Sequence, residues 1–163
     1  VQDAVRTLPH KLRRLCLSAY QSRLFDRLVE ARLQTLGTLL AGDLACKHAN
    51  GACFLVSDPA AEQPRADRFE ISPSAPLFGC KVPLAEGEAG RLEKELLASE
   101  GVSLKAFRLG DGLTMEGERR PLRVPLNAPR VQRDGDGLIL FFSLPRGSYA
   151  TCVTDEVMKP TPS

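Results

Sequence analysis

A change in hydrophobic period near residue 119 constrains the fold of this chain more than any other feature. Over residues 8–40 and 86–99, apolar side chains recur every three or four positions, which is typical of amphipathic helices. From residue 119 onward the period is two. Residues 122–126 alternate, and residues 138–144 form a nearly continuous apolar run, typical of a strand covered on both faces. We therefore expect an α+β protein, with helices and a small antiparallel sheet first and antiparallel strands afterwards.

Turn and cap residues divide the chain further. An Asn-Gly pair predicts a type I′ turn within a hairpin over residues 43–57, and the Asp-Gly-Asp-Gly sequence at 134–137 predicts a second tight turn. We expect Gly37 and Gly101 to end the two main helical stretches. Ser148 is expected to cap a short helix near the C-terminal end. The first stretch is either one helix or two.

Composition is typical of a soluble globular protein. The chain has 163 residues, is 43% hydrophobic and 26% charged, and has no apolar run near the ~18 residues of a membrane span. Its start lacks the apolar segment of a signal peptide, so we expect a cytoplasmic protein that does not contact membranes. The five cysteines include no C-x-x-C pair and are accompanied by two histidines. We therefore predict reduced, mostly buried thiols and no metal site.

Charge is distributed unevenly along the chain. Residues 1–50 hold eight Lys/Arg against four Asp/Glu, whereas residues 51–100 hold five against nine. The net charge of +2 is too small to indicate a nucleic-acid partner by itself. The basic end is compatible with a polyanion-binding face or with an ordinary solvated surface.

Three ordered sequence blocks narrow the choice of function. Residues 15–26 contain Ser-Ala-Tyr-Gln-Ser and end in Asp26; residues 76–90 read Pro-Leu-Phe-Gly-Cys-Lys-Val-Pro-Leu-Ala-Glu-Gly-Glu-Ala-Gly; residues 144–151 read Leu-Pro-Arg-Gly-Ser-Tyr-Ala-Thr. A fourth block begins at Arg119-Arg120. In content, order and spacing, these blocks resemble the TruD family of tRNA pseudouridine synthases, in which Asn is usual at the position of Asp26.

The resemblance implies a tRNA partner and an isomerase that converts a uridine of tRNA to pseudouridine without a metal or organic cofactor. Family members have an antiparallel catalytic sheet that is interrupted by a large inserted domain. By this resemblance, residues 1–117 are the inserted domain, and residues 118–163 are strands and a terminal helix of the catalytic sheet.

The family's essential aspartate lies in a G-x-x-D-K motif, early in the catalytic domain, and this chain contains no such motif. Its aspartates from position 26 onward all lie in other sequence contexts: Asp26, Asp43, Asp58, Asp67, Asp111, Asp134, Asp136 and Asp155. We therefore expect no catalytic residue in this chain and no turnover by the chain alone. The N-terminal catalytic part is expected to be absent from it.

Several residues are candidates for contact with RNA. The corner at Pro145, Arg146, Gly147 and Ser148 combines a cation with backbone N–H groups, which suits a phosphate, although it also fits a simple capped turn. The other cationic candidates belong either to phosphate contacts or to solvated faces. They are Arg14 and Arg23 of the first helix, Lys81, and Arg119, Arg120 and Arg123.

Further residues are candidates for the wall of the active site or for structural roles. Leu144, Pro145 and Tyr149 are candidates for the active-site wall, with a place in the core as the alternative for Tyr149. We interpret Tyr20 and Gln21 as structural. Three carboxylates of the second helix are interpreted as complementing its dipole: Glu86, Glu88 and Glu93.

Three functional hypotheses remain open. The chain is part of an RNA-modifying enzyme, a stand-alone non-catalytic RNA-binding or scaffold module, or a structural fragment without affinity for RNA. The predicted strand at 138–144 has an edge without its usual neighbours, and such an edge invites pairing with a second copy of the chain. A homodimer through that edge is therefore also a hypothesis.

Overall fold

The computed structural model describes residues 8–110 and 112–159 and divides the chain into two compact units between Arg123 and Val124. We call residues up to Arg123 unit 1 and residues from Val124 unit 2. Unit 1 contains α2 (His10–Ala31), η1 (Leu33–Thr35), β1 (Leu44–Lys47), β2 (Cys53–Leu55), α3 (Pro59–Asp67), β3 (Ile71–Leu77), α4 (Gly87–Ser99), η2 (Leu104–Phe107) and β4 (Glu118–Pro121). Unit 2 contains β5 (Asn127–Asp134), β6 (Gly137–Ser143) and α5 (Ala150–Val157). The α+β class predicted from the sequence is confirmed.

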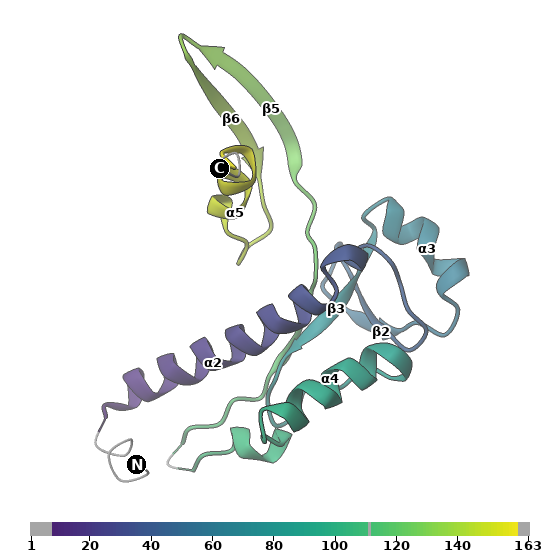
Figure 1. Ribbon diagram of the computed structural model, residues 1–163, viewed down its shortest axis with the longest axis vertical. Helices are drawn as coiled ribbons and strands as arrows, with labels where there is room; N and C mark the ends of the chain where they lie inside the picture. The colour runs from purple at the N-terminus through teal and green to yellow at the C-terminus, as the bar shows by residue number, and fades with distance from the viewer. Residues whose placement is uncertain (1–7, 111, 160–163) are drawn as a thin grey trace. The chain divides into compact units, whose positions relative to one another are not determined.

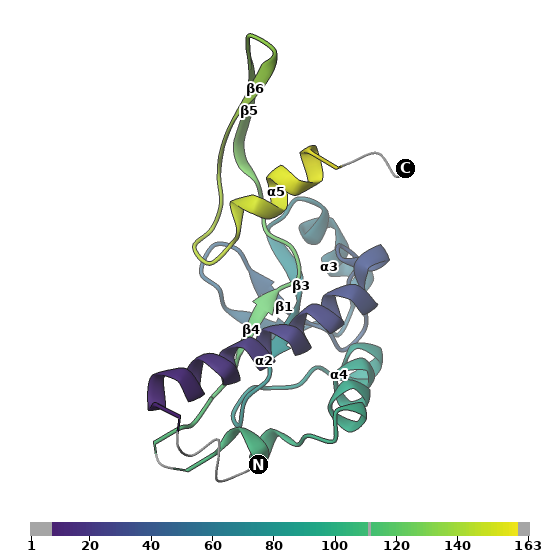
Figure 2. The ribbon, with the colours of Figure 1, turned by 60° about the vertical axis from the view of Figure 1, so that its left-hand side comes forward.

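Unit 1 is built on a four-stranded antiparallel sheet in the order β2-β1-β3-β4. The helix α2 packs against β3 and also contacts α4 (Figure 1, Figure 2). Their apolar faces meet in a core that includes Leu24 and Leu28 of α2 and Leu96 and Leu97 of α4, closed by Phe78 just after β3. A smaller core beneath α3 contains Leu39, Ala45, Val56, Ala66 and Ile71.

The central strand β3 contains two prolines, which lack the N–H donor that a sheet ladder uses. The strand accommodates them because its two neighbours pair mainly with different halves of it. Strand β1 pairs with Ile71 to Pro73, whereas β4 pairs with Ser74 to Leu77. The Pro73 carbonyl accepts a hydrogen bond from the Leu122 N–H, with N and O 2.8 Å apart.

The first helical stretch is a single helix, α2, and it ends at Ala31 rather than at Gly37. After Ala31 the Arg32 side chain turns inward to Asp43 and to the Thr38 carbonyl, and the chain continues as the short helix η1. The prediction that Gly37 is the C-cap is therefore wrong. Gly37 instead lies close to Arg123, since a Cβ at position 37 would be 2.6 Å from the Arg123 guanidinium, which would have to shift.

The predicted hairpin over residues 43–57 is confirmed as β1 and β2, but its turn is longer than a two-residue type I′ turn. Gly51 has a positive φ of 74°, whereas Asn50 does not. A disulfide joins Cys46 and Cys53, which face each other in the ladder. The prediction that all five thiols are reduced is wrong for this pair, because antiparallel register places two distant cysteines side by side. Cys16, Cys80 and Cys152 are free.

The second predicted helix is α4, and Gly101 follows its end with a φ of 63°, as expected of a C-terminal glycine. Glu86 and Glu88 lie at its N-terminal end. Glu93 does not act as a dipole partner, because it is buried and paired with an arginine. In the described residues, no helix combines the length and apolar character that crossing a membrane would need.

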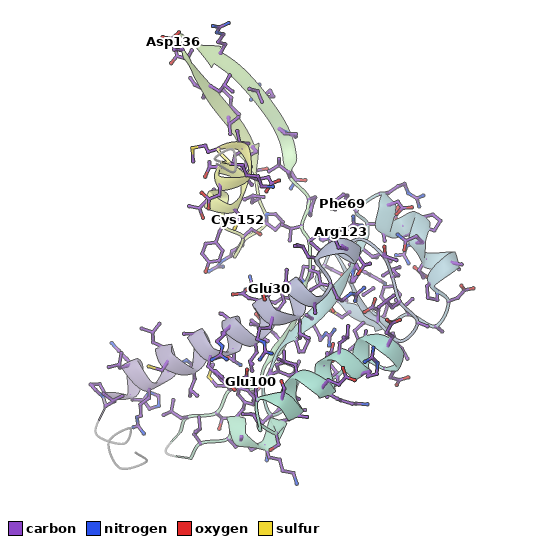
Figure 3. The ribbon with its side chains drawn as sticks, in the orientation of Figure 1. Glu30, Phe69, Glu100, Arg123, Asp136 and Cys152 are labelled. Atoms are coloured by element: carbon purple, nitrogen blue, oxygen red, sulfur yellow. A yellow bond between two sulfur atoms is a disulfide. The ribbon has the colours of Figure 1, made fainter. Side chains whose placement is uncertain are left out.

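Unit 2 is a hairpin followed by a short helix (Figure 1). Asp134 pairs with Gly137, so the predicted turn spans two residues, and Figure 3 labels Asp136 at the tip. The prediction that the apolar strand is covered on both faces is wrong for this chain, because Leu138 is 62% exposed and Val131 is 66% exposed. The N-cap of α5 is Tyr149 rather than Ser148, and no side-chain hydrogen bond caps this helix, so the prediction for Ser148 is wrong.

The division between the units lies a little beyond the predicted boundary at 117/118. Strand β4 pairs with β3 and therefore belongs to unit 1. The assignment of residues 1–117 to an inserted domain and of residues 118–163 to a catalytic sheet stays a prediction.

Candidate nucleic-acid interface

Two buried ion pairs hold unit 1 together. Arg119 of β4 and Glu93 of α4 lie 2.7 Å apart with side chains 3% and 4% exposed. Arg32, after α2, and Asp43, before β1, lie 2.6 Å apart and are also buried, with side chains 6% and 0% exposed. Burial raises the pKa of Glu93, and the nearby Arg119 charge opposes that shift. Burial likewise lowers the pKa of Arg119, against the attraction of Glu93.

One arginine of these pairs, Arg119, is also a predicted RNA contact. The Arg119 guanidinium also donates to the Ser74 hydroxyl and carbonyl, at 3.0 and 2.5 Å, and to the Pro83 carbonyl at 3.3 Å. Its bonds are therefore internal. Arg123 bonds the Ala66 carbonyl, and its guanidinium carbon lies 4.2 Å from the centre of the Phe69 ring. Figure 3 labels both residues. Both guanidinium groups therefore have partners within unit 1.

Phe69, whose ring contacts the Arg123 guanidinium, has an unusual backbone conformation. Phe69 has a φ of +55°, although it is not a glycine. It ends α3 in a Schellman motif: its N–H bonds the Ala66 carbonyl and the Glu70 N–H bonds the Arg65 carbonyl, each at 3.0 Å. Glycine is usual at this position. The Arg123 guanidinium stacked on the ring stabilises the phenylalanine there.

Several other cations of unit 1 are paired on its surface. Arg23 and Arg27 of α2 both bind Glu100, which Figure 3 labels after α4. Lys81 lies 2.5 Å from Glu116, and this pairing raises the pKa of Lys81. Arg120 is partly exposed and has interactions within the chain. Arg14 is exposed and has no hydrogen-bond or ion-pair partner among the described residues.

Arg14 lies at an open pocket of about 400 Å³ in unit 1. One wall is a face of α2 that carries Arg14, Ser18, Gln21 and Ser22. The other wall consists of Leu77, at the end of β3, and residues 114–118. A pocket of this size is in the range of small-ligand sites.

Two glycines allow the second wall to lie against the end of β3. A Cβ on Gly79 would lie 2.2 Å from the Gly117 nitrogen, and Gly117 has a φ of 83°. The wall is fixed by backbone hydrogen bonds from Cys80 to the Met115 carbonyl and from Lys81 to the Glu116 carbonyl, both 2.9 Å. The pocket is therefore part of the packed fold rather than a gap in a loose loop.

Sequence reasoning missed this pocket. It treated Gln21 as structural, and the structure shows that the Gln21 amide nitrogen does donate to the Phe78 carbonyl at 2.5 Å. It assigned no role to Ser18, Ser22 or Glu118. A usable signal was present in the spacing, because Arg14, Ser18 and Ser22 recur every four residues and so share one helix face. The facing wall could not be deduced from that spacing.

The predicted corner lies in unit 2. Arg146, Gly147 and Tyr149 are exposed, and Tyr149 is 73% exposed. Leu144, Pro145 and Ser148 are partly exposed. The corner therefore presents a cation and an aromatic ring to solvent, although the Ser148 N–H is used internally. In residues 8–110 and 112–159, no three His, Cys, Asp or Glu side chains gather closely enough to hold a metal ion.

Comparison with known proteins identifies the class. The model of the family described as tRNA pseudouridine synthase D (TruD) matches residues 1–157. The chain is 64% identical over 158 residues to tRNA pseudouridine synthase D of Geobacter metallireducens, covering 97% of this chain and 39% of that protein. The corresponding protein of Syntrophotalea carbinolica is also 64% identical, with 97% and 40% covered. The proteins that the chain matches are thus pseudouridine synthases.

A solved structure agrees with the sequence comparisons. The crystal structure of a TruD-family protein from Methanosarcina mazei superposes with a TM-score of 0.78 at 27% identity, covering 95% of this chain and 40% of that one. The chain belongs to the TruD family of tRNA pseudouridine synthases. It spans about 40% of the length of the curated relatives it matches.

Proposed function

We propose that this chain is part of a tRNA pseudouridine synthase, an isomerase that converts a uridine of tRNA to pseudouridine. The observation that carries the proposal is 64% identity across 97% of the chain to a protein named for that activity. The matching fold supports it, since residues throughout both units superpose on a TruD structure.

The chemistry assigns the reactive group to polypeptide outside this sequence. Pseudouridine formation breaks the N-glycosidic bond, turns the base and rejoins it to the sugar through carbon. A carboxylate either attacks the sugar or removes a proton from it, and both roles need an ionised aspartate beside an extruded uridine. Because the sequence contains no G-x-x-D-K motif, the proposed catalytic aspartate belongs to the remaining part of the protein. No cofactor is needed for this reaction.

The proposed contribution of this chain is RNA binding. Two exposed arginines can meet phosphates: Arg14 of unit 1 and Arg146 of unit 2. Lys81 and Arg23 can do so only by exchanging a carboxylate partner for a phosphate. Arg120 is a further proposed contact, whereas Arg119 and Arg123 act in this proposal as internal supports. Gly147 and Ser148 shape the corner, and Leu144, Pro145 and Tyr149 are proposed to form the wall beside the uridine.

The reaction itself is tested by tritium release from tRNA labelled at C5 of uridine. The full-length protein should release tritium, because C5 loses its hydrogen when it joins the sugar. The 163-residue chain alone should release none. Release by the chain alone would overturn the placement of the catalytic aspartate, and absence of release by the full-length protein would overturn the proposed reaction.

The absence of the G-x-x-D-K motif also favours a second candidate, a non-catalytic RNA-binding module. Both candidates require tRNA affinity that falls steeply with salt, because Lys and Arg contacts release counterions from phosphates. Titration of the chain with tRNA at two salt concentrations tests this. No binding at low salt would exclude both roles for the isolated chain and leave a structural part.

Two further aspects of the protein are proposed. A tRNA partner implies a cytoplasmic location. In the described residues, β6 pairs with β5 alone, so its other edge can pair with a second copy of the chain. Sedimentation equilibrium tests that homodimer: Ile139→Lys should yield monomers if the edge mediates it, and a wild-type chain that stays monomeric contradicts it.

A further inference from the structure

The pocket on α2 contains polar groups that the fold itself does not use. Arg14, Ser18 and Ser22 have no side-chain hydrogen-bond or ion-pair partner among the described residues. The same holds for the Glu118 carboxylate on the opposite wall. Some other charged side chains of unit 1 do have partners, for example Arg23 with Glu100 and Arg119 with Glu93. The pocket thus collects hydrogen-bonding capacity that remains available to a ligand.

Gln21 adds an acceptor with a fixed direction. Its side chain is 6% exposed, and its Nε2 donates to the Phe78 carbonyl at 2.5 Å. That bond settles which end of the amide is nitrogen and holds it. The Oε1 atom has no hydrogen-bond partner among residues 8–110 and 112–159, and the residue lines the pocket. A buried amide held in this way offers an acceptor without the entropy cost of ordering a free side chain.

The α2 wall displays these groups in a row. Arg14, Ser18 and Ser22 are spaced by four residues, so they follow one another along a single face. The row extends for about 12 Å, from the rise of roughly 1.5 Å per residue. It begins with a cation and continues with two hydroxyls. A phosphate followed by a ribose presents the complementary order, a charge and then hydroxyl groups.

The opposite wall selects for hydrogen-bond donors. Glu118 carries a carboxylate without an ion-pair partner in the described part of the chain, and Glu116 nearby is already paired with Lys81. A carboxylate accepts hydrogen bonds and repels phosphate, so it fits the base end of a nucleotide rather than its phosphate end. Guanine offers two adjacent N–H donors to one carboxylate. Uracil offers one and places carbonyl oxygens on both sides of it.

We propose that this pocket binds a single unpaired RNA nucleotide, with its phosphate on Arg14, its ribose along Ser18 and Ser22, and the donor edge of its base on Gln21 and Glu118. Guanine is the favoured base. The site rests on the proposed function in that RNA is the natural source of the nucleotide. It is a binding site for a nucleotide other than the reacting uridine, since the described pocket has no aspartate on its walls.

Nuclear magnetic resonance of the ¹⁵N-labelled chain tests the site directly. The probe is guanosine 5′-monophosphate, compared with uridine 5′-monophosphate, guanosine and inorganic phosphate. We expect amide shifts at Ser18, Ser22 and Gly117 and none at Ala60 in α3. Guanosine 5′-monophosphate should bind more tightly than each of the other three. Equal binding of inorganic phosphate, or no shifts at these amides, overturns the proposal.

Two substitutions separate the ends of the nucleotide. Arg14→Gln should weaken guanosine 5′-monophosphate binding by about tenfold and leave guanosine binding unchanged. Glu118→Gln should weaken guanosine 5′-monophosphate by about tenfold and remove its advantage over the uridine nucleotide. The matched controls are Arg91→Gln and Glu88→Gln on the exposed surface of α4, which should change neither affinity. Equal losses in a variant and its control would contradict the assignment.

These measurements do not depend on turnover. If the nucleotide fails to bind but the full-length protein releases tritium from tRNA, the pocket assignment is wrong and the proposed reaction stands. If the nucleotide binds but the full-length protein releases no tritium, the reaction is wrong and the pocket stands.

Discussion

Unit 1 buries apolar side chains and two ion pairs, whereas unit 2 exposes apolar side chains of its hairpin. In unit 1, Leu24 is completely buried, and two ion pairs are enclosed where helices meet the sheet. In unit 2, Leu138 and Val131 are more than half exposed, and the sheet has two strands. A two-stranded hairpin is at best marginally stable by itself in water. Unit 1 therefore has its own core, whereas unit 2 leaves much of the apolar surface of its hairpin exposed.

Some arginines of this chain are paired inside the fold, whereas others are exposed to solvent. Arg119 and Arg32 neutralise carboxylates inside unit 1 and thereby fix how its elements meet. Arg14 and Arg146 are exposed and remain available to an anion. Position along the chain does not distinguish these roles. The presence of a buried carboxylate partner does.

The largest expected effect comes from breaking the pair between α4 and β4. Glu93→Ala leaves the Arg119 guanidinium buried without its counter-charge, and the cost to the free energy of unfolding should be about 3–5 kcal/mol. Urea unfolding followed by circular dichroism measures it. The control is Glu95→Ala, which removes an exposed pair with Arg91 and should change stability little.

A double substitution sharpens that prediction. Glu93→Leu combined with Arg119→Met replaces both charges by apolar groups of similar size, so it should recover much of the lost stability. Loss of stability in Glu93→Ala no greater than in the exposed control would show that the pair is not truly enclosed. No recovery in the double variant would show that the hydrogen bonds of Arg119 to Ser74 matter more than the charge balance.

The next effect compares one residue type in the two units. Leu24→Ala removes a side chain at 0% exposure from the core of unit 1 and should lower the free energy of unfolding by about 2–5 kcal/mol. Leu138→Ala removes one that is 62% exposed and should cost far less in this chain. Both are measured by urea unfolding. A large loss for Leu138→Ala would mean that the hairpin is covered in solution, for instance by a second copy.

The disulfide gives a smaller effect, confined to the β1–β2 edge of unit 1. Without reductant, alkylation of the unfolded chain should modify three of the five cysteines, because Cys46 and Cys53 are joined. Reduction should lower the free energy of unfolding by roughly 2 kcal/mol, from the entropy of a short closed loop. The double variant Cys46→Ser/Cys53→Ser should not respond to reductant. Modification of all five cysteines in the untreated chain contradicts the bond.

Local features of the fold were predictable from the sequence. The Asp-Gly-Asp-Gly turn, the α4 helix and its closing Gly101 each depend on a few neighbouring residues, and each is observed. The end of α2 was not predictable from the sequence, because Arg32 leaves the helix to reach Asp43. The exposure of the apolar run in β6 was not, because a sequence pattern indicates that a strand needs cover without indicating whether this chain supplies it.

The candidate site was less predictable from the sequence than the local features of the fold. The first helix was predicted to be basic, but which of its arginines is available depends on Glu100, which binds Arg23 and Arg27 from more than 70 positions away. The pocket needs α2, the end of β3 and residues 114–118 to meet, and the meeting depends on the close approach of Gly79 and Gly117. Such contacts are set by tertiary packing, so no local pattern contains them.

The smallest expected effect is a pH dependence that belongs to unit 1. Burial lowers the pKa of His48, the Arg123 charge lowers it further, and its Nε2 lies 2.9 Å from the Ser72 hydroxyl. Below an unfolded pKa of about 6.5, the unfolded chain takes up a proton that the folded side chain resists. The His48 contribution to stability is therefore full above that value and declines as pH falls through it towards the folded pKa.

The raised pKa of Glu93 acts in the opposite sense, since its folded form holds a proton more tightly than the unfolded one. The measurement is therefore a difference between the wild type and His48→Gln, taken from urea midpoints at about pH 7.5 and about pH 5.5. The wild type should lose more stability on acidification than His48→Gln, by less than any of the preceding effects. An identical loss of stability in both proteins would mean that His48 is solvated in the folded state. The surroundings of His48 and Arg123 would then be more open to water than the structure shows.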